Sequence, residues 1–263
     1  MLRRPRASTL LPPLLGTAAV LGFFELAPRV GLFPRASFPP TSEVFGVLAD
    51  LADTAELWSA IGRTMQAWAG AMAIAALVGV PLGLAIGSSR LGALLCRFTV
   101  EFLRPIPSIA LVPVLVLVYG PNLSLTVALG AFAAAFPLLF QAMYGVTDVD
   151  PVAKDVGRVF GLSRWRRIRH IVLPSCAPYL ATGLRISASV ALILVVTGQY
   201  AVGVPGLGQE VYVAQSGGAY DRVYAWVIVT GLLGLTVNLC FEALERRFLR
   251  WHPSQPQRSA ARL

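Results

Sequence analysis

The residue types that usually perform catalysis are few in this chain and are not grouped. The two histidines, His170 and His252, belong to no His-Glu-x-x-His pattern, and the three cysteines form no Cys-x-x-Cys pair. An odd number of widely spaced cysteines argues against both a disulfide framework and a zinc site. We therefore expect no catalytic residue and no metal site, and a membrane-embedded enzyme is disfavoured because no catalytic pair is present.

The single lysine excludes a nucleotide-binding P-loop within the chain. Such a loop needs Gly-x4-Gly-Lys followed by Ser or Thr, because the lysine reaches the nucleotide phosphates. Lys154 instead follows an alanine and precedes an aspartate. Gly206-Leu207-Gly208 is not a dinucleotide fingerprint either, since no third glycine follows at the required offset. We expect a tight external turn there, and no cofactor bound by this chain.

The composition is that of a membrane protein. Of the 263 residues, 56% are apolar and only 13% are charged, with a mean hydropathy of +0.68. A soluble domain has roughly 25% charged residues, so this chain could not cover its surface in water. The net charge of +9 could suggest nucleic-acid binding, but the basic residues recur between apolar runs. That distribution indicates membrane topology and no nucleic-acid partner.

The apolar runs predict an all-α, polytopic membrane protein. About 20 helical residues cross a 30 Å hydrocarbon core. The uncharged run 105–147 is long enough for two crossings, and Gly120-Pro121-Asn122 is the turn signal that divides it. The six predicted transmembrane helices are 8–27, 64–88, 106–119, 123–145, 178–199 and 222–243.

The basic residues orient these helices. With the N-terminus inside, 17 of the 22 basic residues lie on the cytoplasmic side, four lie outside and one, Arg185, lies within a span. This positive-inside bias predicts a multi-pass protein of the inner (plasma) membrane with both termini in the cytoplasm.

The chain divides into four expected parts. Residues 1–27 form a cytoplasmic N-terminus and the first span, and residues 28–63 form an external segment with a short interfacial helix after Pro39-Pro40. Residues 64–250 form the transmembrane core, including a cytoplasmic loop at 148–174. The polar tail at 251–263 is expected to be disordered.

A stripe of small residues predicts how the second span packs. Alanine or glycine recurs every fourth residue at Ala71, Ala75, Gly79, Gly83 and Gly87. Lipid provides no hydrophobic drive for helices to associate, so close backbone contact through small residues is the usual substitute. We expect these glycines to serve helix packing.

Arg185 is the one ionisable residue well inside a span. An arginine in the bilayer centre costs about 2.5–3.5 kcal/mol on insertion scales, so it usually faces protein or a water-filled path. Two interpretations stay open, namely structural pairing within the bundle and contact with an anionic solute.

The loop between the fourth and fifth predicted spans has the signals of a short helix. Asp150 is a good N-cap, and Pro151 fits the first helical position, where its missing N–H is not needed. Gly161 is placed to end this helix in a left-handed conformation.

A second amphipathic helix should follow, capped by Ser163 and running through Ile171, with Leu173-Pro174 ending it. Arginines occupy the faces that the apolar stripes leave free. On composition alone, such a loop could simply anchor the chain to anionic lipid headgroups.

The spacing in this loop resembles a known family pattern. Gly161, nine residues, Ile171, one residue and Leu173-Pro174 resemble the EAA loop, E-A-A-x3-G-x9-I-x-L-P, of binding-protein-dependent ABC importer permeases. The opening positions are Asp155, Val156 and Gly157, so an aspartate stands where the pattern has glutamate.

Further segments resemble the nitrate/sulfonate/taurine branch of that family. They are Pro-Pro-Thr-Ser-Glu-Val at 39–44, Gly-Leu-Ser-Arg-Trp at 161–165, Gly-Leu-Arg-Ile at 183–186, Gly-Leu-Gly at 206–208 and Glu-Arg-Arg at 245–247. The branch commonly has an acidic residue near the end of the fifth span, where this chain has Gln199.

The resemblance implies a type I, MetI-like permease bundle that imports a small, anionic or zwitterionic solute such as an aliphatic sulfonate, taurine or nitrate. It implies a homodimer, two copies of a cytoplasmic ABC ATPase subunit that uses the ATP, and an extracytoplasmic solute-binding protein. Arg185 and Gln199 become candidates for the translocation path. The residues that would couple to the ATPase are Asp155, Val156, Gly157, Phe160, Gly161, Trp165, Ile171, Leu173 and Pro174.

A self-contained, ion-coupled secondary transporter is the alternative. It would need carboxylates inside the membrane to bind the coupling ion. The candidates, Glu25 and Glu242, lie only near span ends.

Overall fold

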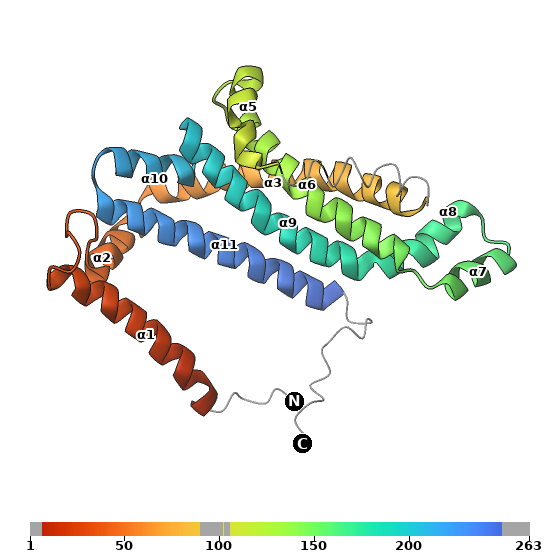
Figure 1. The fold of residues 1–263 in the computed structure, drawn as a ribbon, viewed down its shortest axis with the longest axis horizontal. Helices are drawn as coiled ribbons and strands as arrows, with labels where there is room; N and C mark the ends of the chain where they lie inside the picture. The colour runs from red at the N-terminus through yellow and green to blue at the C-terminus, as the bar shows by residue number, and fades with distance from the viewer. Residues whose placement is uncertain (1–6, 90–101, 103–105, 249–263) are drawn as a thin grey trace.

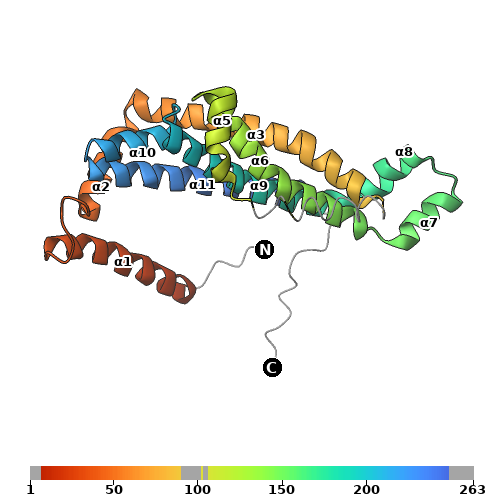
Figure 2. The same cartoon turned by 45° about the horizontal axis from the view of Figure 1, so that its top comes forward.

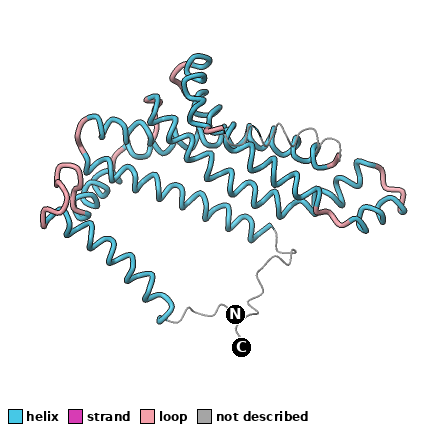
Figure 3. The backbone as a smooth tube through the Cα atoms, in the orientation of Figure 1, coloured by secondary structure: helices cyan, strands magenta, loops and turns pink. Residues whose placement is uncertain are grey.

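The computed structural model describes residues 7–89, 102 and 106–248, and every regular element in these ranges is a helix (Figures 1 and 3). The predicted all-α class is therefore confirmed for this part of the chain. The elements are α1 (Ala7–Arg29), α2 (Thr41–Ala52), α3 (Ala55–Gly87), the 3-10 helix η1 (Ser108–Leu111), α5 (Val112–Tyr119), α6 (Leu123–Thr147), α7 (Pro151–Val159), α8 (Arg164–Arg167), the π-helical turn η2 (Ile168–Val172), α9 (Leu173–Val202), α10 (Leu207–Ser216) and α11 (Tyr220–Phe248).

Four helical stretches are long and apolar enough to cross a membrane. They are α3, α6, the stretch Arg164–Ser216 that contains α9, and α11 up to Arg247. They correspond to the second, fourth, fifth and sixth predicted spans. The first predicted span corresponds to α1, which is 23 residues long and extends away from the other long helices (Figures 1 and 2).

The third predicted span is shorter than expected in the described residues. Its helical part, η1 followed by α5, covers only Ser108–Tyr119, a length of roughly 20 Å against a hydrocarbon core of about 30 Å. The predicted division at Gly120-Pro121-Asn122 is confirmed, because the Asn122 side chain caps α6 by accepting from the Ser124 backbone N–H at 2.8 Å. The count of six full spans is thus not confirmed.

The centre of the bundle is made of α3, α6 and α9, which lie side by side (Figures 1 and 2). The small-residue stripe of α3 faces α6. Ala71 and Ala75 are fully buried, and a Cβ added to Gly83 would lie 2.4 Å from the Leu139 carbonyl oxygen. Gly79 and Gly87 approach the α6 backbone in the same way. These glycines therefore set the distance between the two helix axes.

A second apolar cluster joins α2, the start of α3, α10 and the start of α11. Trp226 is almost fully buried there, against neighbours that include Leu51 and Leu207. The expected short helix after the prolines is present as α2. α3 begins at Ala55, nine residues before the predicted start, because the Thr54 side chain accepts from the Leu57 N–H and caps it. Its 33 residues measure about 50 Å, more than a hydrocarbon core requires.

Val146, Val149 and the fully buried Cys176 form a small cluster where α6 ends and α9 begins. The chain segment that contains α7 and α8 projects beyond this cluster (Figure 1). The predictions for the arginines at 3, 4, 6, 90, 97 and 104 and for the tail at 251–263 lie outside the described residues.

Candidate functional site

The projecting segment 151–172, called the arm below, begins with the helix that the sequence predicts. The Asp150 side chain accepts a hydrogen bond from the Val152 N–H at 2.8 Å, and Pro151 occupies the first helical position of α7. At the other end, Gly161 has a φ of +66°. The Leu162 N–H bonds to the Gly157 carbonyl at 3.0 Å, which completes a Schellman motif. Both predicted caps of α7 are confirmed.

The second half of the arm differs from the prediction. Ser163 does cap α8 by accepting from the Arg166 N–H at 3.4 Å, but the helix does not end at Leu173-Pro174. It continues through η2 directly into α9. Pro174 cannot donate to the His170 carbonyl, and its ring would collide with that carbonyl in a regular α-helix. The π-helical turn just before the proline widens the backbone at this point and removes the conflict.

This continuity means that the arm and α9 form one mechanical unit. Gly157 strengthens the connection because it is buried, and a Cβ there would lie 2.6 Å from Cδ1 of Ile171. The absent side chain lets α7 pack directly on the helix that leads into α9. The Lys154 ammonium also donates to the carbonyl oxygen of Val146, at the end of α6, at 3.1 Å.

The outer face of the arm is apolar and exposed. Val159 is 85% exposed, Phe160 78% and Trp165 68%, and Val152 and Val156 are also exposed. Large apolar side chains are rarely grouped on a surface that faces water unless a partner covers them. Asp155, which stands in place of the pattern's glutamate, forms an exposed ion pair with Arg158 at 2.8 Å.

The predicted coupling residues therefore separate into two groups. Val156, Phe160 and Trp165 are exposed and available to a partner. Gly157, Gly161 and Ile171 shape the arm and attach it to α9. Leu173 and Pro174 lie where the arm becomes α9, and Leu173 is partly exposed.

Arg185 has a partner inside the bundle. Its guanidinium lies 3.3 Å from the Glu245 carboxylate, which joins the middle of α9 to the last turns of α11. The arginine side chain is 37% exposed, so the pair is accessible from outside this single chain. This geometry supports the pairing interpretation of Arg185, and contact with a solute stays a prediction.

Glu245 also lines a hollow of about 790 Å³ between α6, α9 and α11. Tyr179 and Asp148 line the same hollow, and the Tyr179 hydroxyl donates to the Asp148 carboxylate at 2.5 Å. The carboxylates of Asp148, Asp150 and Glu245 make this hollow acidic.

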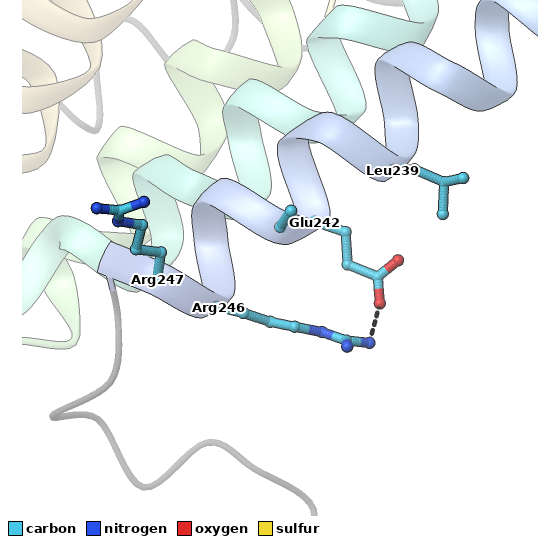
Figure 4. Close-up of a pocket in the computed structure, with 5 residues that line it drawn as sticks. Leu239, Glu242, Arg246 and Arg247 are labelled. Atoms are coloured by element: carbon cyan, nitrogen blue, oxygen red, sulfur yellow. Dashed lines mark hydrogen bonds and ion pairs between the residues drawn. The ribbon is translucent and has the colours of Figure 1, made fainter.

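Another hollow, of about 600 Å³, is lined by the end of α11 alone, where Glu242 pairs with Arg246 one turn later (Figure 4). Arg247 points away from this pair (Figure 4). Cations in the last turn interact favourably with the unpaired helix carbonyls, so both arginines stabilise this end of α11.

Gln199 lines neither of these hollows and is fully buried. Its Oε1 accepts from the Thr64 hydroxyl at 3.0 Å and from the Gly208 N–H at 3.3 Å, while Thr64 Oγ1 accepts from the Leu207 N–H at 2.9 Å. This network fastens the start of α10 to α3 and α9. The placement supports a structural role for Gln199 and gives no support to its predicted place in the translocation path.

The two glycines of the 206–208 turn allow the start of α10 to pack closely against α9. A Cβ on Gly206 would lie 2.3 Å from the Gln199 amide nitrogen, and one on Gly208 would lie 2.1 Å from the Val196 carbonyl oxygen. The turn is predictable from its glycines, whereas the role of Thr64 is not, because a single threonine in an apolar run gives no signal of a partner 135 residues away.

Comparison with known proteins identifies the family. A model described as "Binding-protein-dependent transport system inner membrane component" matches residues 79–250, well over half of the chain. The chain belongs to this family. The permease is 28% identical to the taurine transport system permease of Escherichia coli strain K12, over 90% of this chain and 89% of that protein. It is 26% identical to a putative aliphatic sulfonates transport permease of the same organism, over 89% of each chain.

A solved structure supports the fold independently. The MetNI methionine ABC transporter in its inward-facing conformations matches with a TM-score of 0.65 at 19% identity, over 73% of the permease and 95% of that chain. The MetI-like bundle is therefore confirmed. Family membership makes the permease a membrane transport component rather than an enzyme, and one that works with an ATPase and a solute-binding protein.

Arg185→Ala separates the two interpretations of this arginine in the permease. If its role is pairing, the variant should lose about 1 kcal/mol of unfolding free energy, the value of a partly exposed ion pair. The swapped variant Arg185→Glu/Glu245→Arg should then recover both thermal stability and transport. Recovery of stability without transport would assign Arg185 to solute contact instead. Thermal unfolding and uptake are measured on the same preparations.

Proposed function

We propose that the permease works as a homodimer that forms the translocation path for a small solute with an oxyanion group, of the aliphatic sulfonate, taurine or nitrate type. Two copies of a cytoplasmic ABC ATPase would bind the two arms and use the ATP, and this chain would bind no cofactor. The proposed orientation places both termini and the arm in the cytoplasm, in agreement with the distribution of basic residues.

The observation that supports this proposal most strongly is the exposed apolar face of the arm. Val159, Phe160 and Trp165 are all more than two-thirds exposed, although the same segment has enough arginines to cover itself with charge. An amphipathic helix with an uncovered apolar face is suited to lie in a groove of another protein. The ATPase that the family requires is the natural partner on this side of the membrane.

The backbone of the arm suits it to transmit force. α8, η2 and α9 are continuous, so displacement of the arm moves α9 with it. Gly83 and its neighbours hold α3 against α6, which also packs on α9. Closure of the ATPases would therefore rotate a packed bundle as a body, and alternating access would result from its rocking against the second copy.

The solute class rests on a different argument. The relatives described above are permeases for taurine and aliphatic sulfonates, both of which have a sulfonate group. Specificity in this family rests largely with the separate binding protein, as the resemblance implies. Arg185, near the middle of α9, is the cation of this chain best placed to meet an anion inside the membrane.

Reconstitution in liposomes tests the proposal. The permease is combined with its ATPase and binding protein, and uptake of taurine, an alkanesulfonate and nitrate is measured with and without MgATP. We expect uptake only when all three proteins and ATP are present. Uptake by the permease alone, driven by a proton or sodium gradient, would show instead that it is a secondary transporter.

A further inference from the structure

A basic hollow lies on the inner side of the arm, away from the exposed apolar face. Its volume is about 500 Å³, and it lies between the arm, the end of α3 and the end of α6. Four cationic side chains line it, namely Lys154, Arg158, Arg164 and Arg167. Gly87, the last residue of α3, and Val146, near the end of α6, also line it.

The positive charge in this hollow is only partly neutralised within the described chain. Arg158 pairs with Asp155, and the Lys154 ammonium donates to a backbone carbonyl, which leaves its charge in place. Arg164 and Arg167 form no ion pair with any described residue. The Nε of Arg167 is buried and has no hydrogen-bond partner among the described residues. With Arg164 and Arg167 unpaired among the described residues, the hollow keeps a positive charge that a bound anion would offset.

The chemistry of the lining matches a phosphate group. Guanidinium groups donate two parallel hydrogen bonds to phosphate oxygens, and an ammonium adds a point charge. The position matches the headgroup region of a bilayer, because α3 and α6 both end at the hollow. On the preceding turns α3 exposes apolar side chains, Leu77 and Leu82, along which acyl chains could lie.

We propose that the basic hollow binds the phosphate of an anionic phospholipid, such as phosphatidylglycerol, from the cytoplasmic leaflet. The choice of leaflet rests on the proposed orientation, whereas the phosphate chemistry does not depend on it. A bound lipid would brace the arm against the ends of α3 and α6, next to the junction with α9. The arm would then have one face for lipid and another for protein.

The test compares two double variants with the same change of charge. Arg164→Gln/Arg167→Gln removes two cations of the hollow, and Arg166→Gln/Arg169→Gln removes two exposed cations of the same segment outside it. The permease is purified from nanodiscs of mixed phosphatidylglycerol and phosphatidylcholine, and retained lipid is measured by native mass spectrometry. One basic residue near an anionic membrane is worth about a fivefold change in binding, so the hollow variant should retain about 25-fold less phosphatidylglycerol.

The control variant should retain about as much phosphatidylglycerol as the unmodified permease. Retention of phosphatidylcholine should change little in either variant. Arg164→Lys/Arg167→Lys keeps both charges and most of the Arg167 side-chain stem, which packs near Gly157. This variant should bind much more phosphatidylglycerol than the glutamine variant of the hollow. An equal loss of phosphatidylglycerol in both glutamine variants would show that the lipid is held by general attraction to a basic surface, and it would overturn the proposal. Displacement of the bound lipid by excess inorganic phosphate would identify a free phosphate as the true ligand and would overturn the lipid assignment. ATPase binding by the same variants is measured separately, so failure here leaves the proposed function intact.

Discussion

Val159→Ser/Phe160→Ser is expected to uncouple the permease from its ATPase without unfolding it. Both side chains are more than three-quarters exposed, so their replacement removes little packing within the chain. In a complex they would form the centre of the contact, where a buried aromatic side chain typically contributes at least about 2 kcal/mol. We expect ATPase binding to weaken at least about 30-fold, and ATP-dependent uptake to fall with it.

The matched control is Leu244→Ser, at an exposed apolar position on α11. It should leave ATPase binding unchanged. Binding is measured with purified proteins in nanodiscs, and cross-links from cysteines introduced along 153–168 report the contact directly. Normal affinity in the double variant, together with the absence of cross-links to the ATPase, would contradict the proposed role of the arm.

Gly83→Ala is expected to destabilise the bundle more than any other single methyl addition in the α3 stripe. The new Cβ would lie 2.4 Å from the Leu139 carbonyl oxygen and 2.7 Å from the Ala142 Cβ. The carbonyl belongs to the backbone of α6, so relief requires the two helices to separate along their contact. We expect a loss of about 3 kcal/mol in unfolding free energy, at the upper end of ordinary overpacking.

Gly62→Ala is the control, because it makes the same chemical change on the same helix where a Cβ meets nothing within 4 Å. It should be neutral or stabilising by up to about 1 kcal/mol, the difference in helix propensity. The melting temperatures of the two variants are measured by thermal unfolding in detergent, followed by size-exclusion chromatography. Equal melting temperatures for the two variants would show that α3 and α6 are not in close contact.

Local features of the arm were predictable because they depend on residues close in sequence. Asp150 caps α7 through a residue two positions later, and Gly161 ends it through neighbours within five positions. The prediction that a helix ends at Leu173-Pro174 was wrong because it rested on a local rule about proline. Proline ends an isolated helix, but within the packed chain a π-helical turn accommodates it. Ile171, within that turn, packs close to Gly157 of α7, and such a contact between two helices is not readable from a local rule.

The sequence by itself determined that the chain is helical and embedded in lipid, and where the arm lies, because hydropathy and caps are properties of short segments. The tertiary structure decided which partners the isolated polar residues have. Arg185 meets Glu245, and Gln199 accepts a hydrogen bond from Thr64. These pairs join residues far apart in the chain, and many polar groups could have served each of them equally well. The packing of α3, α6, α9 and α11 brings these partners together, and no short-range sequence pattern encodes that packing.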